Sequence, residues 1–430
     1  MDALTRRRFL LASGVVGATA LAAGAAAYRL DDLFATAGDR DPDAATLVLV
    51  TLYGGNDGLN TVVPYADPAY HDARPELAYS AEQVKRLDDT VGLNPALGGL
   101  HRLHGEGRLA VVRGVGYPKP DRSHFRSMDI WHTAQPARPG TTGWLGRWLD
   151  RAGGDPRLAV SFEPALPPLL AGERAAGASV PVTERKAARG LPEPVLAALA
   201  ATESGESAAR ARAAACFADL LSVDEMVRTV HDAAGTDEPE ADGEAGPATA
   251  TGGARTPLDA QLDLVAQCVE AGVMTRVFSV SLGGFDTHAD EKQLQEVLLG
   301  QVDRAVTAFV DRMARSGAGR KVVVAVYSEF GRRVRANASD GTDHGTASDV
   351  LLLGSAVRGG VYGEAPSLTD LDDGDLTFTT DFRDVYATLL EQVLKTDPVR
   401  CWLAGVAGWP ASCDRAARPD RHGLPTGHRT

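Results

Sequence analysis

The chain has 430 residues, of which 44% are hydrophobic and 23% are charged. This composition is typical of a globular protein with one large domain or two ordinary ones. The formal net charge is −13, and residues 1–27 contribute +2 to it, so the chain without them carries −15. A charge of this sign argues against a nucleic-acid partner, whose phosphates would be repelled, and it suits the binding of divalent cations.

The N-terminus has the features of an export signal. Arg6, Arg7 and Arg8 are followed by Phe9-Leu10, by an apolar run over 11–23 and by small residues up to Ala27. A basic start, a short apolar core and an Ala-x-Ala end predict a secretory signal peptide over 1–27. The paired arginines indicate the twin-arginine translocase, so we expect an exported protein, periplasmic or extracellular.

The fate of this segment has two interpretations. Its apolar run is shorter than the roughly 20 residues that a membrane-spanning helix needs. Cleavage after Ala27 is therefore expected, and retention as an N-terminal anchor is the alternative.

Four cysteines occur, and none has the spacing of a zinc-binding motif. Cys401 and Cys413 are close enough in sequence to pair in an oxidising compartment. Cys216 and Cys268 lie in Ala-rich helical stretches and are expected to be buried thiols. Any metal site must therefore be built from carboxylates and histidines.

Short β-branched runs predict the strands of an α/β domain. They cover residues 46–52, 109–115, 277–282, 321–327 and 350–355. The runs are continuously apolar, which is typical of strands covered on both faces. Helical patterns lie between them, over 294–313 and 382–394. The apolar face expected for the first of these helices consists of Leu294, Val297, Leu298, Val302, Ala305, Phe309 and Met313. We therefore expect a doubly wound, mainly parallel sheet with helices on both faces.

One domain is expected over 28–430, with one interruption. Residues 189–235, approximately, are rich in Ala, Glu and Arg and predict a helical insertion. An acidic Gly/Pro/Thr stretch at about 236–257 predicts a flexible surface loop.

Ligands of open α/β sheets bind beyond the carboxyl ends of the strands, so the loops that follow the strands are the candidate sites. The first strand is followed by Gly54-Gly55-Asn56-Asp57-Gly58, where the glycines allow a sharp turn. Asp57 is either part of a plain turn or a carboxylate held at the mouth of the sheet. After the third strand, Asp286 and His288 are two residues apart, so on an extended segment both face one metal ion.

The loop after the second strand carries a hydroxyl beside a histidine. Ser123 and His124 lie between Arg122 and Arg126, an arrangement suited to attack on an anionic ester. In the alternative interpretation Ser123 caps a helix and both arginines are solvated.

Two further candidates follow the fourth strand. Glu329 emerges from an apolar strand, where a carboxylate needs a cation, a proton or a metal ion. Arg332 or Arg333 would be its ordinary partner. His344 follows Asp343 and is either a ligand with a supporting carboxylate or a hydrogen-bonded loop histidine.

Together these segments resemble the DUF1501 family of exported proteins, within the alkaline phosphatase and sulfatase-like superfamily. The resemblance runs from the export signal to about residue 394 and rests on Gly-Gly-Asn-Asp-Gly at 54–58, Arg-Ser-His-Phe at 122–125, Gly-Gly-Phe-Asp-Thr-His at 283–288, Ser-Glu-Phe-Gly-Arg at 328–332 and Gly-Thr-Asp-His-Gly at 341–345. It implies an alkaline-phosphatase-like fold with two metal ions, a hydroxyl nucleophile and phosphate or sulfate esters as substrates.

Carried over by position, the resemblance makes Asp57 the first metal carboxylate and Ser123 the nucleophile. Asp286 and His288 resemble the next ligand pair. The related hydrolases have Ser-Asp-His-Gly where this chain has Ser-Glu-Phe-Gly at 328–331, so Phe330 stands in place of a ligand. His344 then resembles the last histidine, whereas an alternative alignment makes Asp343 and His344 the Asp-His pair.

Two functions follow as hypotheses. The first is a metal-dependent hydrolase of a small phosphate, sulfate or related ester, using Ser123 or a metal-bound water as nucleophile, with Arg122 or Arg126 holding the anion. Zinc is the expected ion, with manganese, magnesium and calcium left open, at one or two ions per chain. The second is a relative without catalysis that serves as an exported binding or envelope-assembly protein, and Phe330 favours it.

Overall fold

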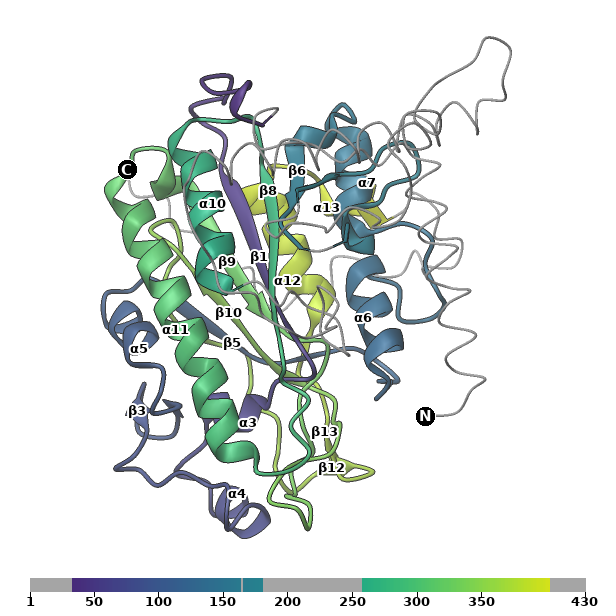
Figure 1. Ribbon diagram of the computed structural model, residues 1–430. Helices are drawn as coiled ribbons and strands as arrows, with labels where there is room; N and C mark the ends of the chain where they lie inside the picture. The colour runs from purple at the N-terminus through teal and green to yellow at the C-terminus, as the bar shows by residue number, and fades with distance from the viewer. Residues whose placement is uncertain (1–32, 164, 181–256, 403–430) are drawn as a thin grey trace, which may run out of the picture.

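The computed structural model describes residues 33–163, 165–180 and 257–402 (Figure 1). The predicted signal peptide, the helical insertion, the acidic loop, Cys216 and Cys413 lie outside these residues. No helix within the described ranges is both long and apolar enough to cross a membrane.

A mostly parallel sheet forms the centre of the molecule. In the described part of the chain it has nine strands, in the order β11-β5-β10-β9-β1-β8-β6-β7, with β14 also paired to β5. Their bounds are β1 Thr46–Tyr53, β5 Leu109–Gly116, β6 Ala159–Ser161, β7 Ala178–Ser179, β8 Val277–Gly283, β9 Val322–Tyr327, β10 Ser348–Leu353, β11 Gly360–Tyr362 and β14 Thr380–Asp381. The five predicted strands are confirmed as β1, β5, β8, β9 and β10. β10 runs antiparallel to both of its neighbours, β5 and β9.

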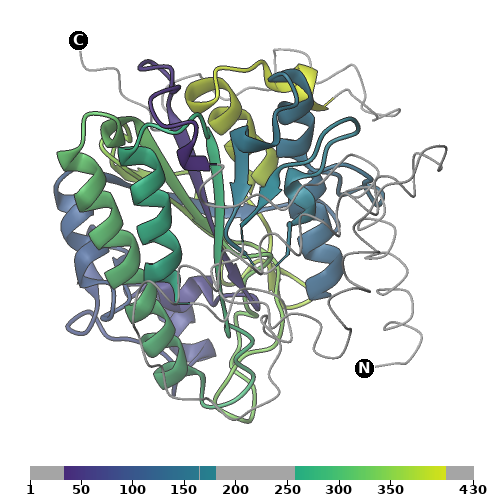
Figure 2. The same cartoon turned by 45° about the horizontal axis from the view of Figure 1, so that its top comes forward.

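Helices cover both faces of this sheet, so the predicted doubly wound α/β class is confirmed (Figures 1 and 2). The two sets of helices pack on opposite faces because alternate residues of each buried strand point in opposite directions. In β1, Val48 and Val50 belong to one apolar core and Leu47 and Leu49 to the other. One face carries α5 Gly98–Gly105, α10 Leu258–Glu270 and α11 Glu291–Arg315; the other carries α6 His124–Thr133, α7 Trp144–Arg151, α12 Phe382–Thr388 and α13 Pro398–Trp402.

Smaller elements complete the described structure. They are the helices α3 Gly58–Thr61 and α4 Pro68–Ala73, a three-stranded sheet of β2 Val62–Val63, β4 Gly92–Leu93 and β3 Lys85–Arg86, and a hairpin of β12 Leu371–Asp372 and β13 Asp375–Leu376. Three 3₁₀ turns span Pro156–Leu158, Pro168–Leu170 and Gly319–Lys321, and a π-helical turn spans Leu389–Val393. The predicted helix over 382–394 is therefore an α-helix continued by a π-helical turn.

The predicted apolar face of α11 is only partly correct. Leu298, Val302 and Phe309 are buried in the core, with Ala305 and Met313 beside them. By contrast, the side chains of Leu294 and Val297 are 45% and 58% exposed. Val297 precedes Leu298 by one residue and so points about 100° away from the buried stripe.

The structure tests one of the two cysteine predictions. Cys268 on α10 is buried as a free thiol, which confirms that prediction. Cys401 is also buried, and because Cys413 lies outside the described residues, their pairing stays a prediction.

Candidate metal centre

The candidate residues gather at one edge of the sheet because of how the strands run. β8 and β9 are both parallel to β1, so the loops after all three strands leave from the same edge. β10 is antiparallel and therefore begins at that edge, so the loop before it arrives there too. This topology brings Asp286, His288, Glu329 and His344 to one place, and the loop after β5 adds His124.

Three imidazoles converge on one carboxylate oxygen of Asp286. The Nε2 atoms of His288 and His344 each lie 3.0 Å from Asp286 Oδ1, and His124 Nε2 lies 3.4 Å from it. His344 Nε2 is in turn 3.0 Å from the Nε2 atoms of both His124 and His288. One ligand atom each from His124, Asp286 and His344 lie within 4.8 Å of one another, which is close enough to bind a single metal ion.

The protonation of these imidazoles shows why a cation fits at this point. His124 Nδ1 lies 2.8 Å from Glu329 Oε1, and His344 Nδ1 lies 2.9 Å from the carbonyl oxygen of Arg122. A carboxylate and a carbonyl only accept hydrogen bonds, so each Nδ1 carries a proton and each ring directs its Nε2 toward Asp286. A divalent ion bound at this point would take the place of any proton on these Nε2 atoms, so that two imidazole lone pairs and a carboxylate oxygen would face it.

The charges around Asp286 favour its ionised form. Burial opposes ionisation, but hydrogen bonds from His124, His344 and Arg332 hold the pKa of Asp286 well below its usual range. Burial likewise disfavours the charged form of His124, yet its contacts with Asp286 and Glu329 raise its pKa to about 9. Burial and the nearby Arg332 lower the pKa of His288. The centre therefore keeps a permanent negative charge at its middle.

Glu329 lies behind His124 and does not reach the point of convergence. The Glu329 side chain is fully buried. Its Oε1 atom accepts hydrogen bonds from His124 Nδ1 and from the backbone N–H of Gly54, the latter at 2.9 Å. Its Oε2 atom accepts a hydrogen bond from Ser328 Oγ at 2.9 Å. Glu329 therefore contacts His124 and is not among the residues whose ligand atoms converge, and its assignment as a metal ligand stays a prediction.

Asp57 is also separate from the cluster. Its fully buried carboxylate forms an ion pair with the fully buried Arg74, and it caps α3 by accepting from the backbone N–H of Leu59. Arg74 thus supplies the balancing charge of Asp57, and the assignment of Asp57 as a metal ligand stays a prediction that this arrangement does not support. Asp343 is largely exposed; its Oδ1 lies 3.7 Å from His288 Nδ1, at the rim and not at the centre.

Arg332 holds a position that sequence reasoning missed. It was expected to pair with Glu329, but its buried guanidinium lies 3.0 Å from Asp286 Oδ1 and also donates to the carbonyl oxygens of Gly55, Phe285 and Thr342. It therefore fixes Asp286 and joins the loops after β1, β8 and β9. Arg333 pairs instead with Asp373 and Asp375 of the β12–β13 hairpin.

Ser123 occupies the N-cap position of α6, directly before His124. Its hydroxyl makes no capping hydrogen bond, and within the described ranges no partner for this hydroxyl is found; its backbone N–H donates to Asp121. The capping interpretation is therefore correct for the position of Ser123 but not for the role of its side chain. Ser123 thus directly precedes His124 in the chain, at the positive end of a ten-residue helix.

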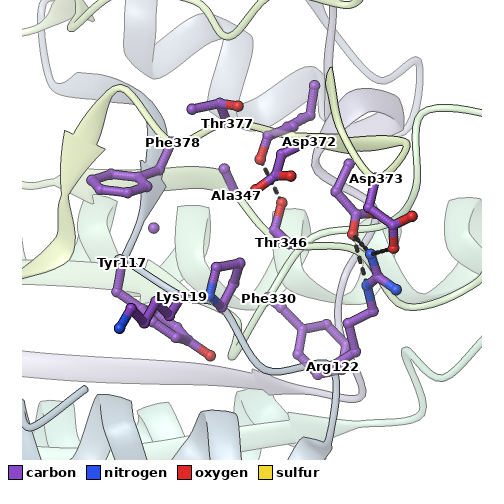
Figure 3. Close-up of a pocket in the computed structure, with 14 residues that line it drawn as sticks. Tyr117, Lys119, Arg122, Phe330, Thr346, Ala347, Asp372, Asp373, Thr377 and Phe378 are labelled. Carbon is purple, nitrogen blue, oxygen red and sulfur yellow. Dashed lines mark hydrogen bonds and ion pairs between the residues drawn. The ribbon is translucent and has the colours of Figure 1, made fainter. Parts of the chain in front are cut away.

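The two arginines of this loop are engaged in ion pairs. Arg122 bonds to Asp373 and Asp375 of the β12–β13 hairpin, and Figure 3 shows its guanidinium pointing toward Asp373. Arg126 pairs with Asp129 one turn along α6. Both guanidiniums already have carboxylate partners, so the anion-holding role expected for them stays a prediction; the Arg122 carbonyl oxygen contacts His344 Nδ1.

The fold and the site together define a class. This is a doubly wound α/β protein with a histidine-rich centre, suited to a metal ion, at the carboxyl edge of its sheet. A family profile described as "Protein of unknown function (DUF1501)" matches residues 44–399, and the chain belongs to that family. The expected family is thereby confirmed.

Known structures give a more distant likeness. A protein of the alkaline phosphatase superfamily from Vibrio parahaemolyticus is 10% identical, covering 85% of this chain and 74% of its own, with a TM-score of 0.38. Murine ectonucleotide pyrophosphatase/phosphodiesterase 5 is 10% identical over 83% and 96%, with a TM-score of 0.38. A phosphonate monoester hydrolase from Silicibacter pomeroyi is 13% identical over 85% and 78%, with a TM-score of 0.37. A search of curated proteins found no match. Likeness at this level says nothing about function.

Proposed function

We propose that this protein is a metal-dependent hydrolase of phosphate, sulfate or related esters. The observation that carries the proposal is the convergence of three imidazoles on Asp286, with Ser123, whose hydroxyl makes no capping hydrogen bond, directly before His124 in the chain. His124, Asp286 and His344 would hold the ion, with His288 as a further ligand. A bound divalent ion supplies Lewis acidity, which polarises the ester and favours attack by Ser123 or by water.

The other residues around the centre orient its imidazoles and stabilise the charge of a bound anion. Glu329 and the Arg122 carbonyl fix the tautomers of His124 and His344, so that both lone pairs face the ion. The N-terminus of α6 directs backbone N–H groups and a partial positive charge toward an anion bound near Ser123. The ester's acidic group would thus be held by backbone and ion, since Arg122 and Arg126 are paired elsewhere.

We propose one ion per chain, with zinc preferred. Imidazole nitrogen with a single carboxylate is a typical zinc ligand set. A second cation beside Asp286 would have to displace the Arg332 guanidinium, and Asp57 already carries Arg74 as its counter-charge. Both positions that could serve a second ion are thus filled by arginine.

Metal analysis of the full mature chain, prepared without chelator, tests this proposal. We expect about one zinc per chain, lost in His344→Ala and kept in the control His101→Ala, whose ring contacts a backbone carbonyl far from the centre. The proposal would be contradicted by a chain that carries no divalent metal and whose thermal unfolding does not change when zinc is added. Hydrolysis of a panel of phosphate monoesters, diesters and sulfates, with Ser123→Ala as the inactive comparison, tests the chemistry.

A second candidate function is that of an exported binding or envelope-assembly protein without catalysis. The Phe330 ring favours it, because the ring is buried and packs 4.9 Å and 5.0 Å, between centroids, from His124 and His344. Stoichiometric metal without turnover on any ester of the panel would support this alternative.

We further propose that the protein works outside the cytoplasm after twin-arginine export. The paired arginines before Phe9 carry this part of the proposal. Replacing Arg6 and Arg7 by lysine is expected to retain the chain inside the cell, whereas the same change at Arg8 alone is expected to leave export intact. Mass spectrometry of the exported chain should give Tyr28 as its first residue; an unprocessed chain in the membrane fraction would support the anchor interpretation.

A further inference from the structure

A pocket of about 330 Å³ lies beside the metal centre (Figure 3). Phe330 and Arg122 connect the two sites: the Phe330 ring packs on both His124 and His344 and lines the pocket, and Arg122 supports His344 through its carbonyl while its side chain lines the pocket. The pocket and the metal centre are therefore neighbours that share Phe330 and Arg122. The volume of the pocket is at the lower end of the range for small-molecule sites.

One end of the pocket is aromatic. Tyr117 and Phe378 both line the pocket and lie to the left in Figure 3, with Phe330 and Arg122 to the right. The Tyr117 hydroxyl is already bonded to Ser127 Oγ at 2.7 Å, so Tyr117 presents its ring to the pocket rather than a donor. Aromatic faces and edges of this kind favour a planar ring packed against them.

The other end of the pocket is polar. The Arg122 guanidinium there pairs with Asp375, whose side chain is almost fully buried, and with Asp373. Lys119 and Asp372 also line the pocket, so its charged groups are of both signs. The preference of the pocket for a ligand would therefore come from its aromatic side chains and not from its charge.

We propose that this pocket is the subsite for the alcohol part of the ester, and that it selects alcohols carrying an aromatic ring. This inference rests on the proposed function, in which the ester's acidic group lies at the metal centre. In the overall hydrolysis, water supplies a hydroxyl to the acidic group and a proton to the departing alcohol, so no other reactant is needed.

Binding of stable phosphonates tests the subsite without turnover, since their carbon–phosphorus bond replaces the ester bond. We expect the zinc-loaded chain to bind benzylphosphonate about fivefold to tenfold more tightly than methylphosphonate by calorimetry. Cyclohexylmethylphosphonate, of similar size but not planar, should fall between them. In Phe378→Ala the advantage of the benzyl compound should drop to about twofold or less, and Leu294→Ala, on the exposed face of α11, should retain it.

The outcomes separate the subsite from the proposed function. Equal binding of the three phosphonates, or an advantage that survives in both Phe378→Ala and Phe378→Leu, would overturn the subsite even if esters are hydrolysed. A benzyl preference without hydrolysis of any ester would support the subsite and reject the hydrolase. With neither binding nor hydrolysis, both proposals fail.

Discussion

At the scale of single residues, the proposed metal centre depends on side chains that would not touch the ion. Glu329 accepts from His124 Nδ1 and is held by Gly54 and Ser328, so it sets the tautomer of His124 from a fully buried position. Such supporting carboxylates commonly change metal affinity by one or two orders of magnitude.

We therefore expect Glu329→Gln to weaken zinc binding about 10- to 100-fold, since a neutral amide supports the imidazole less well. Competition titration against a fluorescent zinc chelator measures this change, with the exposed Glu173→Gln as the control. Unchanged zinc affinity in a folded Glu329→Gln variant would refute the supporting role.

The carboxyl group of Glu291 is expected to make the stability of the fold depend on pH. Burial, and the nearby charge of Asp57, raise the pKa of Glu291 from 4.5 to about 9. Between these two values the unfolded chain releases a proton that the folded chain retains, so this group makes the free energy of unfolding fall as pH rises. Its stabilising contribution is complete below pH 4.5 and is lost by about pH 9.

Glu291→Gln keeps the shape of the protonated acid and cannot ionise. We expect its free energy of unfolding, relative to the parent chain, to increase steadily from pH 5 to pH 9. Urea unfolding at several pH values with the same added metal measures this difference. Parallel curves for the two chains would show that Glu291 ionises normally in the fold.

At the scale of elements, the β12–β13 hairpin ties two loops of the site together. Asp373 and Gly374 have φ values of +52° and +83° at its tip, which makes a tight turn. Asp375 on β13 then bonds to Arg122, beside Ser123, and to Arg333, beside Arg332. The hairpin thereby links the loop after β5 to the loop after β9.

Asp375→Asn is expected to cost about 1–3 kcal/mol of stability, because both arginines lose their buried counter-charge while remaining partly solvated. Thermal and urea unfolding measure the loss, and the exposed Asp370→Asn should change neither. A variant as stable as the parent chain would show that the hairpin is held by its backbone alone.

The elements were largely predictable, and their directions were not. Strands such as β1 and β9 are buried on both faces, so apolar, β-branched composition suffices to find them. The same composition fits either direction, which is why the antiparallel course of β10 could not be predicted. On α11 the periodicity located the helix but not where the core ends, so the exposure of Leu294 was missed.

The site was predictable to the extent that it depends on loops at one sheet edge. That rule brought Asp286, His288 and His344 together correctly. The roles of Asp57 and Glu329 depended on partners 17 and 205 residues away, Arg74 and His124, and no local pattern reports such contacts. His124 was expected to act in catalysis. Its position in the cluster was not predicted, because tertiary packing sets where α6 begins against the sheet.

At the scale of the whole molecule, metal binding should stabilise the fold. The ligands come from loops far apart in sequence, so the unfolded chain lacks the site, and zinc at 1,000 times its Kd should add about 4 kcal/mol. We expect chelation to lower the Tm by several degrees, Asp286→Ala to abolish this response and the exposed Asp89→Ala to retain it. A Tm unaffected by chelator in the parent chain would argue against a resident ion.

The antiparallel course of β10 has a consequence for how an ion enters and leaves. The loop from Ser328 to Ala347 starts and ends on adjacent strands and is cross-linked on itself, with Gly345 donating to Gly331 and Arg332 bridged to His344. The backbone of His344 is therefore anchored between β9 and β10. Of the four side chains in the cluster, His288 is the most exposed, with 44% of its side chain accessible. We therefore expect an ion to enter and leave the proposed centre on the side of His288.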